Sequence, residues 1–263
     1  YPMITFNGPR TELQDDGSRT YSQAEKRFLI GVVIHEVGHI YFPMIVNSDE
    51  RQWTWMDEGL NSFLDGVAGR EWDPTIPWGV EPRDIVSYMK SSNQVPIMTQ
   101  SDSVLRLGPN AYTKPAAALN ILRETILGRE LFDFAFKEYA QRWKYKRPTP
   151  SDFFRTMEDG AGEDLGWFWK GWYYYAWKVD QAITTVNYPK IKPESGATIE
   201  IENIGQMPMP VTVEIEEENG VKVRREFPVE VWQRGSTWKF AYPSTSAIKS
   251  VTIDPDGLLP DIK

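Results

Sequence analysis

The sequence predicts an α+β protein of two domains: a mainly helical domain over residues 1–180 and a small β-sandwich domain over residues 181–263. Apolar residues recur at helical spacing up to about residue 178, and they alternate with polar residues from Ala182 onward. The chain has 263 residues, of which 41% are hydrophobic and 25% are charged. This length and composition are typical of a folded chain with room for two hydrophobic cores.

The helical part begins with a capping-box pattern. Ser22, followed three residues later by Glu25, allows each side chain to bind the other residue's backbone N–H at a helix start. The residues that then recur at helical spacing are Phe28, Val32, His35 and His39. Pro43 predicts the end of this helix, because proline removes a helical hydrogen bond. Residues 54–57 predict the start of a second helix, with Glu58 in its first turns.

Three further helices are predicted at residues 119–126, 131–146 and 150–162. Asp164 is a candidate cap for a last helix that is rich in aromatic residues: Trp167, Trp169, Trp172 and Tyr173. Such a cluster can form a platform for a sugar, but it more often packs between helices. We therefore favour packing.

The C-terminal part alternates with the period of a strand in residues 198–202, 211–215, 229–232, 238–242 and 251–253. Asn219-Gly220 lies between two such runs and predicts a tight hairpin. An antiparallel sandwich with polar outer faces accounts for this pattern. The charged positions are those of a solvated face, and no cluster in this part suggests chemistry.

One motif suggests a metal site. Residues 35–39 read His-Glu-Val-Gly-His and contain the only two histidines of the chain, and Glu58 follows His39 after 18 intervening residues. Residues four apart lie on one face of a helix, so both imidazoles can reach one ion. A catalytic zinc site uses three protein ligands and leaves one position for water. The spacing therefore predicts a Zn2+ site on His35, His39 and Glu58.

Two more acidic residues extend this predicted site. Glu36 is next to the first ligand, close enough to take a proton from the metal's water without binding the metal itself. Asp65 lies two turns after Glu58 on the same helix face, where it can accept a hydrogen bond from a ligand imidazole. The alternatives are a helix whose polar face carries two histidines by chance and, for Asp65, a solvated helix residue.

Composition argues against other classes of function. The chain has no cysteine, so a zinc site must use histidine and carboxylate ligands. A formal net charge of −8 without a basic stripe argues against nucleic acid as a partner. The sequence shows no signal peptide and no apolar run as long as a bilayer is thick, so we expect no membrane span in this chain.

Two segments resemble a known family. The zinc motif with residues 55–63, Trp-Met-Asp-Glu-Gly-Leu-Asn-Ser-Phe, resembles the aminopeptidase N family of zinc metallopeptidases, which are gluzincins. Residues 110–114, Asn-Ala-Tyr-Thr-Lys, resemble the family's Tyr-x-Lys stretch at a helix start. The resemblance covers nearly the whole chain as the family's catalytic and C-terminal portions. It implies a thermolysin-like, mainly helical catalytic domain, zinc-dependent hydrolysis of peptide bonds, and a catalytic Tyr112 whose hydroxyl stabilises the oxyanion.

Related zinc enzymes fit the residues less well. Thermolysin-like enzymes themselves share the spacing from His39 to Glu58, but they carry an aspartate four residues after the glutamate. This chain has Ser62 at that position, and its acid is Asp65. Glycyl aminopeptidases usually have a longer gap before the glutamate.

One departure from the family bears on specificity. The family binds the free amino group of its substrate with a Gly-x-Met-Glu-Asn motif before the zinc helix, and residues 1–3 resemble the stretch directly C-terminal to that motif. We therefore expect the N-terminal part of the full protein to be missing here and to act with this segment on a peptide substrate. The resemblance favours an aminopeptidase. Two alternatives remain: a zinc endopeptidase, and a non-catalytic, metal-stabilised module that binds peptide or protein. For localisation, we slightly favour export from the cytoplasm.

Overall fold

The computed structural model describes residues 3–8, 11–190 and 192–263. The chain forms two compact units, one from residues up to 81 and 95–165, the other from 82–94 and from 166 onward. The domain boundary expected at residue 180 stays a prediction. Tyr1 and Pro2, which resemble the continuation of an amine-binding motif, lie outside the described residues.

Helix α1 (Gln23–Gly38) of the first unit starts where the sequence predicts, and it ends before the predicted stop at Pro43. The Glu25 backbone N–H donates to the Ser22 hydroxyl at 3.2 Å, and the Ser22 N–H donates to the Glu25 carboxylate. A π-helical turn (Ile40–Ile45) comes next, and the backbone leaves the helical conformation at Phe42, with φ −117° and ψ 106°. The cause is Pro43, because a proline forces the residue before it into an extended conformation.

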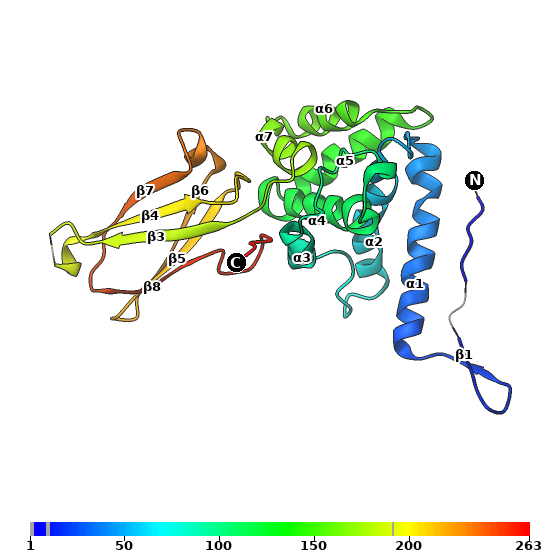
Figure 1. The fold of residues 1–263 in the computed structure, drawn as a ribbon, viewed down its shortest axis with the longest axis horizontal. Helices are drawn as coiled ribbons and strands as arrows, with labels where there is room; N and C mark the ends of the chain where they lie inside the picture. The colour runs from blue at the N-terminus through cyan, green and yellow to red at the C-terminus, as the bar shows by residue number, and fades with distance from the viewer. Residues whose placement is uncertain (1–2, 9–10, 191) are drawn as a thin grey trace. The chain divides into compact units, whose positions relative to one another are not determined.

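Helix α2 (Glu58–Trp72) comes after a 3₁₀ turn (Thr54–Met56), as the sequence predicts. It packs against α1 on one side and against α4 (Lys114–Ile121) on the other (Figure 1). A π-helical turn (Gly108–Thr113) leads directly into α4. Helix α2 therefore lies between α1 and the continuous segment 108–121. These three segments, with His39 directly after α1, carry all the candidate site residues.

The rest of the first unit supports this arrangement with an aromatic core. Helices α5 (Arg129–Trp143) and α6 (Pro150–Ala161) pack against each other. A second capping box, Thr149 with Asp152, starts α6, and Gly162 ends it in the left-handed conformation at φ 66°. The aromatic residues buried in this core include Phe63, Phe132, Phe136, Tyr139 and Phe153. A short hairpin of β1 (Glu12–Leu13) and β2 (Arg19–Thr20) precedes α1 and was not predicted from the sequence.

The stretch Gln23–Ile45 is, within the described residues, long and apolar enough to cross a membrane by length and composition alone. The same stretch contains His35 and His39, and a signal sequence or the core helix of a protein passes the same test. The expectation that the chain has no membrane span therefore stays a prediction.

In the second unit, helix α3 (Val86–Lys90) and helix α7 (Gly166–Trp169) precede the strands, and a π-helical turn (Lys170–Tyr174) comes after α7. Trp169, Trp172 and Tyr173 are buried, with Trp172 at 0% exposure. A sugar-binding platform needs exposed ring faces. The burial therefore supports the packing role that the sequence favours for this cluster.

Two three-stranded antiparallel sheets complete the second unit (Figure 1). One has the order β3-β4-β7 and the other β6-β5-β8. The strands are β3 (Gln181–Asn187), β4 (Ala197–Asn203), β5 (Val211–Glu217), β6 (Lys222–Phe227), β7 (Thr237–Tyr242) and β8 (Ile248–Ile253). Ile199 and Ile201 from one sheet share a buried core with Val213 and Ile215 from the other, so the sheets pack face to face as a sandwich. The hairpin at Asn219-Gly220 joins β5 to β6 as predicted.

The strand predicted at residues 229–232 is wrong. Val229–Trp232 forms a 3₁₀ turn after Pro228, which has no N–H to donate to a sheet. Val231 is buried, and the neighbouring Trp232 also packs on the core and donates its indole N–H to the Met209 carbonyl at 2.8 Å. A strand would send these two neighbours to opposite faces, whereas a tight turn directs both inward.

Glu217 closes one end of the sandwich with a buried carboxylate. It accepts hydrogen bonds from the Tyr242 hydroxyl at 2.7 Å, the Thr245 hydroxyl at 2.6 Å and the Ser246 N–H at 2.8 Å. Burial raises the pKa of Glu217, but the hydrogen bonds from Thr245 and Tyr242 outweigh it and lower the pKa to about 2. The ionised form therefore stabilises the folded unit.

We expect Glu217→Gln to lower the free energy of unfolding by about 1.5–3 kcal/mol at pH 7, because the hydrogen bonds lose their charged acceptor. The folded-state pKa lies below the ordinary value of 4.5, so the stabilisation is complete above about pH 5 and is lost as pH falls towards 2. Urea unfolding of both proteins between pH 7 and 2 should show the difference shrinking in this window. The exposed neighbour Glu218, changed to Gln, is the control, and a difference that stays constant with pH would contradict the assignment.

Candidate metal centre

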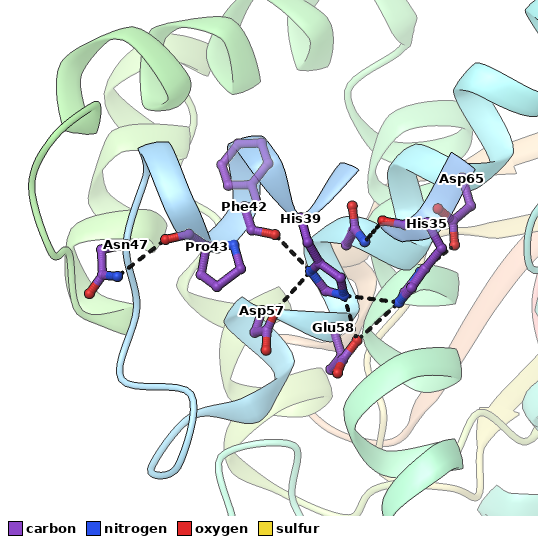
Figure 2. A network of polar contacts seen from close by, with 9 residues as sticks. His35, His39, Phe42, Pro43, Asn47, Asp57, Glu58 and Asp65 are labelled. Carbon is purple, nitrogen blue, oxygen red and sulfur yellow. Dashed lines mark hydrogen bonds and ion pairs between the residues drawn. The ribbon is translucent and has the colours of Figure 1, made fainter. Parts of the chain in front are cut away.

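Three donor atoms converge between α1 and α2. The Nε2 atoms of His35 and His39 lie 3.1 Å apart. Glu58 Oε2 lies 3.1 Å from the first of these atoms and 3.3 Å from the second (Figure 2). His35 lies in the last turn of α1, His39 is the C-cap residue directly after it, and Glu58 is the first residue of α2. The structure thus brings together the three residues that the sequence predicts as ligands.

The spacing of these atoms fits a metal ion. Ligand atoms at about 2.0–2.1 Å from a tetrahedral ion are about 3.3 Å from each other. The observed separations of 3.1, 3.1 and 3.3 Å are close to this value. Two imidazoles and one carboxylate are also the ligand set of a hydrolytic zinc site with an open position. His35, His39 and Glu58 can therefore hold a divalent metal ion.

The second ring nitrogen of each imidazole, Nδ1, lies beside a hydrogen-bond acceptor. His35 Nδ1 lies 2.8 Å from Asp65 Oδ2, and His39 Nδ1 lies 2.9 Å from the Phe42 carbonyl oxygen and 3.0 Å from Asp57 Oδ1 (Figure 2). Because these partners are acceptors, each Nδ1 carries the proton and each Nε2 is left with its lone pair for a metal. The rings are thus oriented by atoms that do not belong to the ligand set.

The pKa shifts result from this network. Burial lowers the pKa of His35, but hydrogen bonds to Asp65 and Glu58 outweigh it and raise the pKa. Burial likewise lowers the pKa of His39, and Asp57 and Glu58 raise it further than burial lowers it. Burial raises the pKa of Glu58, whereas the two imidazoles lower it, with the net effect well below the usual range. The acidic residues therefore favour the protonated form of both imidazoles. A metal ion must displace these protons to bind.

Small residues allow the helices to come this close. A Cβ on Gly38 would lie 2.0 Å from the side-chain oxygen of Asn61 on α2. The Asn61 amide donates to the His35 carbonyl at 2.6 Å, which ties α2 to the last turn of α1. A Cβ on Gly59 would lie 2.6 Å from Pro115 and 2.9 Å from the Ala111 carbonyl, so Gly59 allows the turn before α4 to approach Glu58.

Glu36 and Tyr112 flank the donor atoms. The Tyr112 ring stacks on the His35 ring at a centroid distance of 6.0 Å. Burial raises the pKa of Tyr112, and a hydrogen bond with Glu58 raises it further, so the hydroxyl keeps its proton at neutral pH. Glu36 is half-buried on α1 and lines two hollows beside the centre. The structure thus places both predicted catalytic residues beside the donor atoms.

The two hollows differ in size and lining. The first encloses about 190 Å³ on the side of His39 and is lined by Glu36, Glu50, Asp57 and apolar residues that include Ile40 and Met44. The second encloses about 570 Å³ on the side of His35 and Tyr112, with an apolar wall. Glu36 lies between them, so a ligand that extends from one hollow into the other passes this carboxylate.

Several contributors to the site were not predicted from the sequence. The sequence indicates Asp57 only as part of a helix start, although its carboxylate faces His39. The Phe42 carbonyl and Asn61 were not predicted to take part. The Phe42 carbonyl faces the His39 imidazole, and the Asn61 amide donates to the backbone carbonyl of His35. Asp57 directly precedes the predicted ligand Glu58, and this position could have identified it as a neighbour of the site. A backbone carbonyl leaves no signal in a sequence.

The chain matches the peptidase family M1 domain over residues 4–172, which is more than half of its length. It belongs to that family. This membership agrees with the resemblance found in the zinc motif and in residues 110–114, and M1 peptidases are metallopeptidases.

Named relatives agree with this family. Glutamyl aminopeptidase from Sus scrofa is 28% identical over 168 residues, which are 60% of this chain and 17% of that protein. A probable aminopeptidase 2 from Sulfurisphaera tokodaii is 28% identical over 181 residues, which are 64% of this chain and 22% of that protein. The chain thus spans about a fifth of the length of these curated relatives.

A solved structure shows the same fold. Aminopeptidase A from Legionella pneumophila, determined in complex with aspartic acid, matches 92% of this chain and 27% of its own with a TM-score of 0.64. The sequence identity is 14%, so this likeness concerns the fold. It confirms the expected α+β architecture of a helical part followed by a sandwich.

We expect Gly38→Ala to push the Asn61 amide away from α1, because the added Cβ has no room. The cost is about 1–3 kcal/mol in the free energy of unfolding, with about tenfold or more weaker binding of Zn²⁺. Urea unfolding and a zinc titration against a chromophoric chelator measure the two effects. Gly31→Ala on the same helix is the matched control, because a Cβ there meets only Trp78 at an ordinary 3.7 Å. Equal behaviour of the two variants would contradict this account.

Proposed function

We propose that this chain is a zinc-dependent peptidase and that it removes N-terminal residues from peptides as an aminopeptidase. The observation that supports the proposal most strongly is the convergence of His35, His39 and Glu58, with Glu36 and Tyr112 beside them, in a chain of family M1. Zinc bound by these ligands would polarise the scissile carbonyl and lower the pKa of its water to about 7.

Glu36 acts as the general base. Its carboxylate is one residue from the His35 ligand and borders both hollows, so it is within reach of a water next to the donor atoms. It takes a proton from the attacking water and delivers it to the leaving amine. Asp65 and Asp57 do not react, but they hold the imidazoles in the orientation that leaves Nε2 free.

Tyr112 stabilises the negative charge that develops on the carbonyl oxygen. Its raised pKa keeps the hydroxyl protonated, so it can donate a hydrogen bond to this oxygen. In the structure the hydroxyl interacts with Glu58 instead, and it has to release this partner when substrate binds. The turn of residues 108–113 gives Tyr112 its position close to α2.

The names of relatives support the aminopeptidase part of the proposal over an endopeptidase. Pig glutamyl aminopeptidase and the Sulfurisphaera protein are both aminopeptidases by name. The convergence of His35, His39 and Glu58 and the stacking of Tyr112 on His35 weigh against a binding module without activity.

We expect Glu36→Gln to keep the metal and lose turnover by about 10²–10⁴-fold, because the amide cannot accept a proton. Metal content by mass spectrometry and hydrolysis of a peptide series by the full-length protein are the two measurements. His35→Ala is the matched control, and it should lose the metal as well. Full activity of the Glu36→Gln protein would remove Glu36 from the mechanism.

For Tyr112→Phe we expect kcat to fall by about 10²-fold or more, the scale of one lost oxyanion donor. KM should change little, since the phenyl ring keeps its stacking on His35. Steady-state kinetics with one good substrate separates the two constants. An unchanged kcat would show that the hydroxyl has no part in the chemical step.

A further inference from the structure

The larger hollow is lined by both polar and apolar side chains. Its polar lining includes His35, Glu36 and Tyr112, the residues proposed to act on the peptide bond, and also Arg27, Ser62 and Asp65. Its apolar wall comes from Phe28 and Val32 on α1, together with Trp78 from the segment after α2. The hollow has a volume of about 570 Å³ and is open to solvent, so a large side chain can enter it from outside.

Trp78 is fixed in this wall by its backbone and its ring. Its indole N–H donates to the Asp73 carbonyl at 3.0 Å, and its own carbonyl accepts from Arg70 at 3.1 Å. The Asn120 amide donates to the Val80 carbonyl at 2.7 Å and holds the next part of the segment against α4. The segment that carries Trp78 is thus anchored on both α2 and α4.

Gly69 makes room for the Trp78 ring, and Gly31 lies near the far end of the ring at an ordinary contact distance. A Cβ on Gly69 of α2 would lie 2.4 Å from the Trp78 Cγ atom. A Cβ on Gly31 of α1 would lie 3.7 Å from Cζ3 at the other end of the ring. The ring therefore extends from α2 towards α1, and it reaches the wall of the hollow in one orientation. A rigid aromatic surface of this kind binds an apolar group at little entropic cost.

We propose that Trp78, with Phe28 and Val32, binds a large apolar side chain of the peptide next to the bond that is cut, and that Trp78 sets the preference for this side chain. This inference rests on the proposed function. An apolar pocket separates side chains that differ by a methylene by about 10–200-fold. A phenylalanine or leucine side chain should therefore be preferred over glycine at this position by at least an order of magnitude.

The test uses two peptide series in which the residue on one or the other side of the scissile bond is Gly, Ala, Leu or Phe. The ratio of kcat/KM for Phe over Gly, measured by competition, is compared between the natural protein and Trp78→Ala. We expect this ratio to fall about tenfold or more in one series and to stay constant in the other. Ratios unchanged in both series would overturn the proposal.

Two further variants separate specificity from folding. Phe28 is 46% exposed on α1, so Phe28→Ala should fold normally and lower the same ratio in the same direction. Trp72, at the end of α2, is 67% exposed and does not line the hollow, so Trp72→Ala should leave both ratios unchanged. A drop in the ratio for Trp72→Ala equal to that for Trp78→Ala would show a general effect of tryptophan loss and would overturn the proposal.

A binding experiment distinguishes failure of this inference from failure of the proposed function. Two hydroxamates that differ only in a benzyl or a methyl side chain are titrated calorimetrically into the zinc-loaded protein. We expect tighter binding of the benzyl compound, by about tenfold or more, and loss of this preference in Trp78→Ala. If no peptide is hydrolysed but the benzyl preference depends on Trp78, the enzyme assignment fails and the pocket stands. If peptides are hydrolysed and the preference is the same in both proteins, the pocket assignment fails.

Discussion

The close approach of α1 to α2 is the constraint on which the candidate centre depends. Gly38 and Asn61 set it, because the first has no side chain and the second fills the space and bonds to the His35 carbonyl. The imidazoles on α1 can meet the Glu58 carboxylate on α2 only at this helix separation. Gly59 plays the same part on the other side of α2, where it admits the turn that carries Tyr112. The candidate ligands and Tyr112 are thus positioned by residues to which no part in the chemistry is assigned.

Elements with strong local signals could be predicted from the sequence. The capping box at Ser22 and the hairpin at Asn219-Gly220 form where expected, because each is determined by interactions between residues a few positions apart. The strand prediction for Val229–Trp232 failed, because four alternating residues are compatible with a strand and with a tight turn. The conformation of this segment is decided by the burial of Val231 and by the core that Trp232 contacts. This long-range packing is not encoded in local periodicity.

The same distinction applies to the site. His35 and His39 could be placed on one face from their spacing alone, and Asp65 could be placed near them by counting helical turns. The acceptors on His39 could not be found in this way. The Phe42 carbonyl reaches its ring only because the backbone leaves the helix before Pro43. The Trp78 wall depends on how a loop folds back over Gly69, and nothing in the local sequence fixes that path.

The acceptors beside the two Nδ1 atoms have a consequence for how a metal is removed and reloaded. Asp65, Asp57 and the Phe42 carbonyl belong to the protein and hold the rings whether or not an ion is present. We therefore expect removal of a bound metal with a chelator to leave the ligand residues in position, so that reloading requires proton release rather than refolding. We expect the emptied centre to accept other divalent ions of similar size. Spectroscopically visible ions such as Co²⁺ can then report on a site where zinc itself is silent.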